Sequence, residues 1–112
     1  MTSFIYKEYV SKLNEFEKKY APKNLYYQGD AGLLLKGARV SVVGSRNPTK
    51  EGIRRAKELT RALVNNDITV VSGLAEGIDT VAHETCIEHG GRTIAVLGTP
   101  LNEIYPKKNQ SL

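Results

Sequence analysis

Three short apolar runs alternate with two helical patterns between residues 39 and 98, and this alternation constrains the fold more than any other feature. The first run, 39–43, is too uniform to have a solvent-facing side, which is typical of a central strand in a parallel sheet. Further strands are predicted at 68–71 and 93–97, with helices over about 47–65 and 77–89 between them. Strand, helix, strand, helix, strand with short links predicts an α/β fold, one half of a doubly wound nucleotide-binding sheet with flanking helices.

The first 30 residues show a different pattern. Apolar and aromatic residues recur at helical spacing between positions 4 and 20, and Pro22 ends this pattern. We therefore predict an N-terminal amphipathic helix within residues 1–22 and an α/β domain over residues 23–112. Residues 25–28 read as a short strand closed by a Gly-Asp turn, and we expect this strand to add an edge to the parallel sheet.

The first strand ends in a loop whose residues suit a phosphate group. Gly44 lets the chain turn sharply and approach a ligand, Ser45 carries a hydroxyl, and Arg46 can make a bidentate contact to phosphate. Two plainer interpretations stand beside this one: Gly44 only ends the strand, and Arg46 is an exposed residue that pairs with Glu51. The loop lacks the further glycines of a dinucleotide-binding fingerprint, so we expect no such cofactor.

A second loop of similar design follows the second strand. Ser72, Gly73 and Gly77 form a predicted cradle, because the start of the following helix offers free N–H groups and a dipole that favours an anion. Asp79 and His83 are four residues apart and share a helix face. They are candidates for the same site, as an acid/base couple or as a carboxylate that orients a histidine. Asp79 could also serve only to cap the helix or to balance its dipole.

Cations line the first long helix, and Arg54 lies near its start. Arg54 could extend a phosphate track from Arg46, although a solvated helix face explains the same charges. Lys107 and Lys108, near the C-terminus, are a weak signal of the same kind.

Bulk properties narrow the class of protein. A net charge of +4 over 112 residues only modestly favours a nucleic-acid partner. One cysteine cannot form an internal disulfide, and no histidine or cysteine cluster has the spacing of a zinc site, so we expect no metal. The sequence has neither a signal peptide nor an apolar run of about 18 residues, which favours a cytoplasmic protein without a membrane span.

At these motifs the chain resembles the DNA-processing protein A family, also called DprA/Smf. The resemblance covers residues from about 25 to 112 and rests on several motifs in order and spacing. These are Gly44-Ser45-Arg46, the segment from Ser72 to Asp79, Ala82-His83, the segment from Gly91 to Gly98, and Ile104-Tyr105-Pro106. It implies the first half of an extended Rossmann-like domain, with Gly44, Ser45, Arg46, Ser72, Gly73, Gly77, Asp79 and His83 in the ligand pocket.

The resemblance also implies a function: binding of single-stranded DNA, without catalysis, during DNA uptake, natural transformation and recombination. The implied partners are single-stranded DNA and the RecA recombinase. A small-nucleotide sensor or a phosphoribohydrolase-like enzyme is the alternative from another class. Because three or four strands leave a sheet edge open, we also expect a homodimer.

Overall fold

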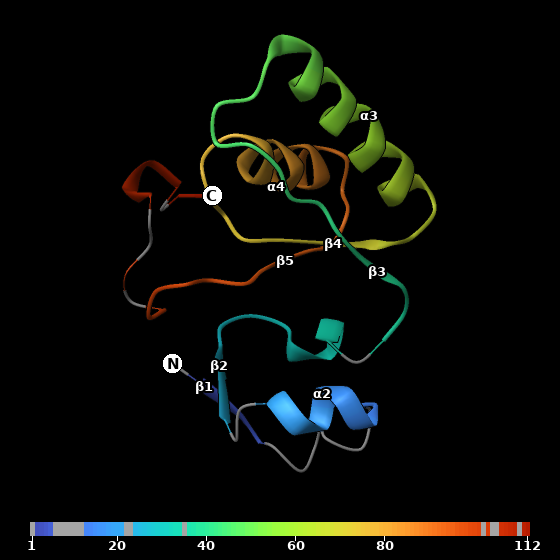
Figure 1. Ribbon diagram of the computed structural model, residues 1–112. Helices are drawn as coiled ribbons and strands as arrows, with labels where there is room; N and C mark the ends of the chain where they lie inside the picture. The colour runs from blue at the N-terminus through green and yellow to red at the C-terminus, as the bar shows by residue number, and fades with distance from the viewer. Residues whose placement is uncertain are drawn as a thin grey trace. The chain divides into compact units, whose positions relative to one another are not determined.

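The computed structural model describes residues 2–5, 13–21, 24–34, 36–101, 103, 106–109 and 111–112 of the chain. The chain divides into two compact units, Met1–Lys36 and Gly37–Leu112. The division falls between residues 36 and 37, whereas the sequence pattern suggested a boundary between 22 and 23. Figure 1 shows the elements of each unit.

The first unit holds a small antiparallel sheet, in which β1 (Thr2–Ile5) pairs with β2 (Asn24–Tyr27). The helix α2 (Glu15–Tyr20) begins at Asn14, whose side chain and that of Glu17 cap each other's backbone N–H groups. A single 3₁₀ turn, η1, covers Ala31–Leu34.

Two predictions for this unit need correction. The prediction of a helix over 4–20 is wrong at residues 4 and 5, which lie in β1, and it is correct over Glu15–Tyr20. Residues 6–12 lie outside the described part of the chain. The strand predicted at 25–28 exists as β2, but it pairs with β1 and adds no edge to the parallel sheet. Helical spacing of apolar residues did not reveal β1, because the antiparallel partner lies about 20 residues away in sequence.

The second unit contains the predicted alternation of strands and helices. Its elements are β3 (Arg39–Ser41), α3 (Lys50–Asn65), β4 (Thr69–Ser72), α4 (Ile78–Glu88), β5 (Thr93–Ala95) and the 3₁₀ turn η2 (Lys107–Asn109). The three strands are parallel in the order β3-β4-β5, with Val40 beside Val70 and Val71 beside Ile94. This is the predicted α/β arrangement of a parallel sheet with flanking helices.

Local signals set the ends of both helices. Thr49 begins α3, and its hydroxyl accepts a hydrogen bond from the N–H of Gly52 at 3.0 Å. After α4, Gly90 adopts the left-handed conformation that favours glycine, with φ at +71°. Among the helices of the described residues, none combines the length and the hydrophobicity that crossing a bilayer requires.

The core of the second unit lies between the sheet and the two helices, which pack against each other and against β4 (Figure 1). Its buried side chains are Val42, Ala56, Leu63, Val70, Ile78, Ala82 and Cys86. Of the apolar residues along α3, Ala56 and Leu63 are buried, whereas Leu59 is 48% exposed.

The prediction that 39–43 forms a central, fully buried strand is wrong. β3 is an edge strand of the three-stranded sheet, and all three of its residues are exposed. Val42, just beyond it, is buried, but Val43 is 71% exposed. The run has an exposed side because, within the described part of the chain, β3 has one neighbouring strand. The two helices pack mainly against each other and against β4.

Candidate functional site

The loop after β3 passes directly over the start of α4, and glycines make this approach possible. A Cβ atom on Gly44 would lie 2.8 Å from the side chain of Ile78, and one on Gly77 would lie 2.2 Å from the carbonyl oxygen of Ser45. That carbonyl accepts a hydrogen bond from the N–H of Ile78 at 3.0 Å. The first N–H group of α4, predicted to be open to an anion, is therefore already engaged by the chain itself.

The loop between β4 and α4 is organised by the carboxylate of Asp79, which is 7% exposed. Its Oδ2 atom accepts hydrogen bonds from the N–H groups of Gly73, at 3.1 Å, and Ala75, at 3.4 Å. The predicted cradle thus has the right geometry for an anion, but the anion that it holds is this side chain.

Ser72 is a structural residue in this arrangement. Its hydroxyl is buried and donates to the carbonyl oxygen of Val42 at 2.6 Å, which ties the ends of β4 and β3 together. The Ser72 side chain, which we predicted to be part of the ligand cradle, donates its proton to this carbonyl instead.

His83 is 2% exposed and belongs to the core. Its Nδ1 lies 2.7 Å from Thr93 Oγ1, whose own proton goes to the carbonyl oxygen of Val70. Nδ1 is therefore the protonated nitrogen, and Nε2 is buried with no hydrogen-bond partner among the described residues. Burial lowers the pKa of His83, which the nearby Asp79 carboxylate and a backbone contact with Ser72 only partly oppose.

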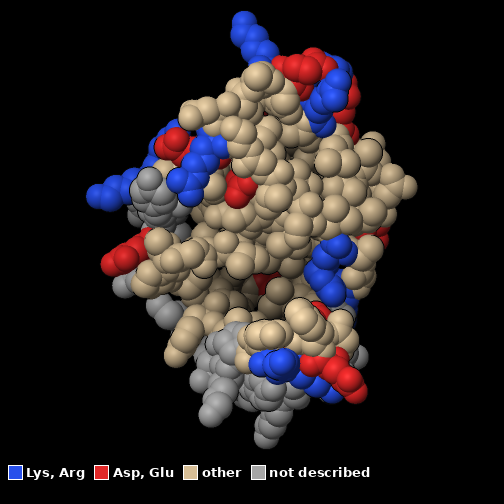
Figure 2. All heavy atoms as spheres, in the orientation of Figure 1, with Lys and Arg blue, Asp and Glu red and all other residues tan. Residues whose placement is uncertain are grey.

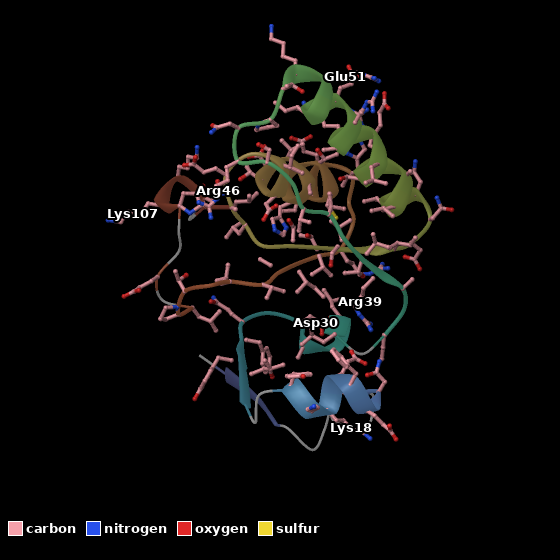
Figure 3. The ribbon with its side chains drawn as sticks, viewed as in Figure 1. Lys18, Asp30, Arg39, Arg46, Glu51 and Lys107 are labelled. Atoms are coloured by element: carbon pink, nitrogen blue, oxygen red, sulfur yellow. The ribbon has the colours of Figure 1, made fainter. Side chains whose placement is uncertain are left out.

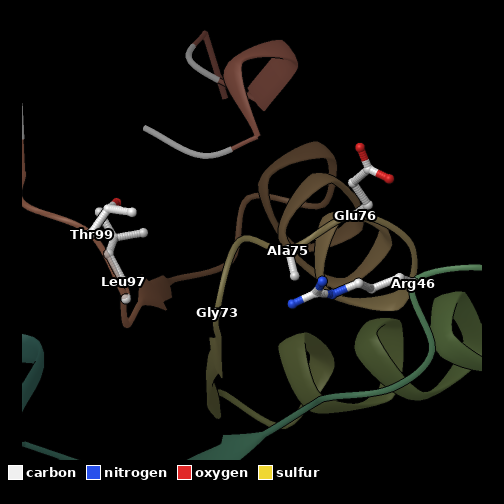
Figure 4. Close-up of a pocket in the computed structure, with 7 residues that line it drawn as sticks. Arg46, Gly73, Ala75, Glu76, Leu97 and Thr99 are labelled. Carbon is white, nitrogen blue, oxygen red and sulfur yellow. The ribbon is translucent and has the colours of Figure 1, made fainter. Parts of the chain in front are cut away.

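A pocket of about 300 Å³ opens beyond the ends of β4 and β5. Arg46 reaches it from the first loop, and its guanidinium group lies beside Ala75 in Figure 4. No described residue forms an ion pair with Arg46, so its charge is available to a ligand. The pocket is lined by Arg46, Gly73, Ala75, Glu76, Leu97, Gly98 and Thr99.

Of the predicted site residues, the structure brings Arg46 and Gly73 together in this pocket. Gly44, Ser45 and Gly77 shape the adjoining turns without lining it. The Oγ of Ser45 accepts from the N–H of Asn47 at 3.0 Å, within its own loop. Ser72, Asp79 and His83 lie beneath the site, in the interior.

Arg54 does not extend the site. It pairs on the surface of α3 with Glu51 and Glu58. The Arg54 guanidinium, followed by that of Arg55, lowers the pKa of Glu51. Glu51 thus pairs with Arg54 and Arg55 and not with Arg46, contrary to the predicted alternative. Figure 3 shows Glu51 at the start of α3 and Arg46 apart from it.

Five lining residues were not among the predicted ones: Ala75, Glu76, Leu97, Gly98 and Thr99. Ala75 and Glu76 belong to the second loop, and the others follow β5, where ligands of parallel sheets are expected. Their place after a strand was a usable signal for them. Within the described residues, no group of three or more His, Cys, Asp or Glu side chains is placed to hold a metal ion.

Comparisons with known proteins identify the family of this chain. The family model for DNA recombination-mediator protein A matches residues 1–112. The chain is 47% identical over 92 residues to DNA processing protein DprA of Streptococcus pneumoniae, covering 82% of this chain and 32% of the relative. It is 52% identical over 73 residues to protein Smf of Synechocystis, covering 65% of this chain and 18% of that relative.

Solved structures give the same result. DNA processing protein A from Streptococcus pneumoniae superposes with a TM-score of 0.81 at 37% identity, covering 98% of this chain and 38% of that one. The protein of the same name from Helicobacter pylori, described for its single-stranded DNA binding mode, gives 0.65 at 34% identity, covering 72% and 36%. The chain therefore spans about a third of the length of these structures, and it belongs to the DNA recombination-mediator protein A family.

Proposed function

We propose that this chain binds single-stranded DNA through its phosphate groups at the Arg46 pocket, as part of DNA processing in transformation and recombination. The observation that carries the proposal is the unpaired guanidinium of Arg46, held beyond the strand ends in a pocket between two loops and the end of β5. A guanidinium is suited to bidentate contact with phosphate. The relative from Helicobacter pylori, 34% identical, is described as binding single-stranded DNA.

The proposed role is binding without catalysis. The pair that could have acted as acid and base, Asp79 and His83, is 7% and 2% exposed and does not line the pocket. Asp79 is already engaged by two backbone N–H groups, and the protonated nitrogen of His83 faces Thr93. Both side chains therefore hold the loop and the core together.

Other proposed partners follow from the family and from the open sheet edge. We also propose self-association of this chain through the β3 edge. The interaction with RecA that the resemblance implies stays a prediction, as does a cytoplasmic location.

A titration of labelled oligothymidylate tests the function. Arg46→Ala should weaken binding by about 1.5–3 kcal/mol, the scale of a hydrogen bond to a charged group. Arg54→Ala is the matched control, because it removes the same charge from a residue that is paired outside the pocket. Its effect should be several-fold smaller. Equal losses in the two variants would contradict a specific role for the pocket.

A parallel titration with nucleoside monophosphates separates the alternative function. Binding of these nucleotides with release of free base would favour a nucleotide-processing enzyme. Tight oligothymidylate binding without any turnover would support the proposal.

A further inference from the structure

The turn η2 is fastened to the pocket loop by a buried side chain. Asn109 is 5% exposed, and its amide donates to the carbonyl oxygen of Leu74 at 3.0 Å and to Thr80 Oγ1 at 2.8 Å. The Thr80 hydroxyl donates in turn to the carbonyl oxygen of Ala75 at 2.7 Å. One amide group therefore holds two successive carbonyls of the loop, the first directly and the second through Thr80.

The held loop has a backbone conformation that needs support. Leu74 has φ at +62°, in the left-handed region that side chains with a Cβ atom rarely adopt, and it is only 8% exposed. The hydrogen bond from Asn109 to the carbonyl oxygen of Leu74 stabilises this conformation. The carboxylate of Asp79 accepts hydrogen bonds from the N–H groups of the residues before and after Leu74.

Fastening η2 brings a cation to the pocket. The Nζ atom of Lys108 lies 3.3 Å from Oε1 of Glu76, which lines the pocket together with Arg46. Glu76 points away from the guanidinium in Figure 4. Acidic and basic side chains are mixed on the face seen in Figure 2.

We propose that η2 sets the charge of the pocket: Asn109 holds the turn in place, and Lys108 engages Glu76 so that Arg46 remains open to a phosphate. This inference rests on the proposed function. Without Lys108, Glu76 would repel a phosphate and would also be the nearest acidic residue in the pocket to compete for Arg46. The side chains of Lys108 and Glu76 are 64% and 44% exposed, so their pair acts on charge placement far more than on stability.

Two surface substitutions and their combination test the charge balance. At about 0.1 M salt, Lys108→Ala should weaken oligothymidylate binding about threefold to tenfold, as expected for one partly screened charge. Glu76→Gln should restore the affinity of Lys108→Ala to within about twofold of the parent. The charge-matched control is Lys57→Ala on the exposed face of α3, which should change affinity less than Lys108→Ala.

Asn109→Ala tests the fastening itself without any DNA. Amide hydrogens of residues 73–76 should exchange faster in this variant, while those of β4 keep their protection. Unchanged exchange in the loop would contradict the role of Asn109.

The outcomes separate this inference from the proposed function. If the parent binds oligothymidylate in an Arg46-dependent way but Glu76→Gln fails to rescue Lys108→Ala, the charge-setting role is wrong and the function stands. A direct contact of Lys108 with DNA would produce that result. If the parent binds no oligothymidylate, the proposed function fails and this inference fails with it.

Discussion

At the scale of single residues, the site depends on glycines whose missing side chains leave room for another part of the chain to pack closely against them. Gly77 is the most constrained of them: its φ is +81°, and the carbonyl oxygens of Ser45 and Arg46 fill the space where a side chain would begin. Gly90 has a similar φ of +71° but open space around it. Comparing the two positions therefore separates the cost of the left-handed backbone conformation from the cost of a steric clash.

Gly77→Ala should therefore lower the free energy of unfolding by more than about 3 kcal/mol, because a left-handed alanine and a clash with backbone add together. Gly90→Ala should cost only about 1–2 kcal/mol, the conformational part alone. Denaturant unfolding of both variants measures the difference. Equal losses would show that the first loop yields easily to a methyl group at position 77.

The sequence indicated which segments form the site, but not which of their side chains face the pocket and which face the core. Arg46 and Gly73 line the pocket, as expected of residues that follow parallel strands, and their role in binding stays a prediction. Asp79 and His83 share a helix face as expected, but that face is turned into the core. Helical spacing shows which residues lie together and not which way the helix is rotated.

At the scale of elements, α4 carries the largest buried polar side chain of the unit. His83 is neutral in the interior, because burial lowers its pKa below the ordinary value of 6.5. The unfolded chain then takes up a proton at this residue before the folded chain does as the pH falls. The stabilisation is thus present above about pH 6.5 and is lost below it.

The free energy of unfolding should accordingly decrease as the pH falls below about 6.5, by up to about 1.4 kcal/mol per pH unit for one proton. Denaturant titrations at several pH values measure this slope. His83→Asn should flatten it, whereas His89→Asn, at an exposed position, should keep it. A slope that survives in His83→Asn would assign the effect to other groups.

The elements themselves were predictable where their signals are local. Thr49 and Gly90 mark helix ends through their own chemistry, and the order of strands and helices follows from short-range patterns. The pairing of β1 with β2 and the exposure of β3 depend on which segments become neighbours in space. The spacing of apolar residues does not indicate which segments become neighbours in the folded chain.

At the scale of the whole molecule, β3 is an edge strand of the parallel sheet that the described residues form. Val40 and Val43, in and beside this strand, are 37% and 71% exposed. Exposed edge strands with apolar side chains tend to pair with another chain. We therefore propose that two copies of this chain associate along β3.

Light scattering should show a dimer of this chain at micromolar concentrations, and Val43→Asp should shift it toward the monomer. Leu59→Asp is a matched control, because Leu59 is 48% exposed on α3, away from the edge. It should leave the mass unchanged. A monomeric parent chain over the same range would contradict the proposal.

The hydrogen bond from Ile78 to Ser45 also bears on when the site forms during folding. It joins residues 33 positions apart (78 − 45), so a loop of that length must close before the bond exists. Closing such a loop has an entropic cost that local helices do not bear. The two helices can begin to form from local contacts alone, but the pocket requires both loops and the assembled parallel strands. Capacity to bind should therefore be among the last properties that the folding chain acquires.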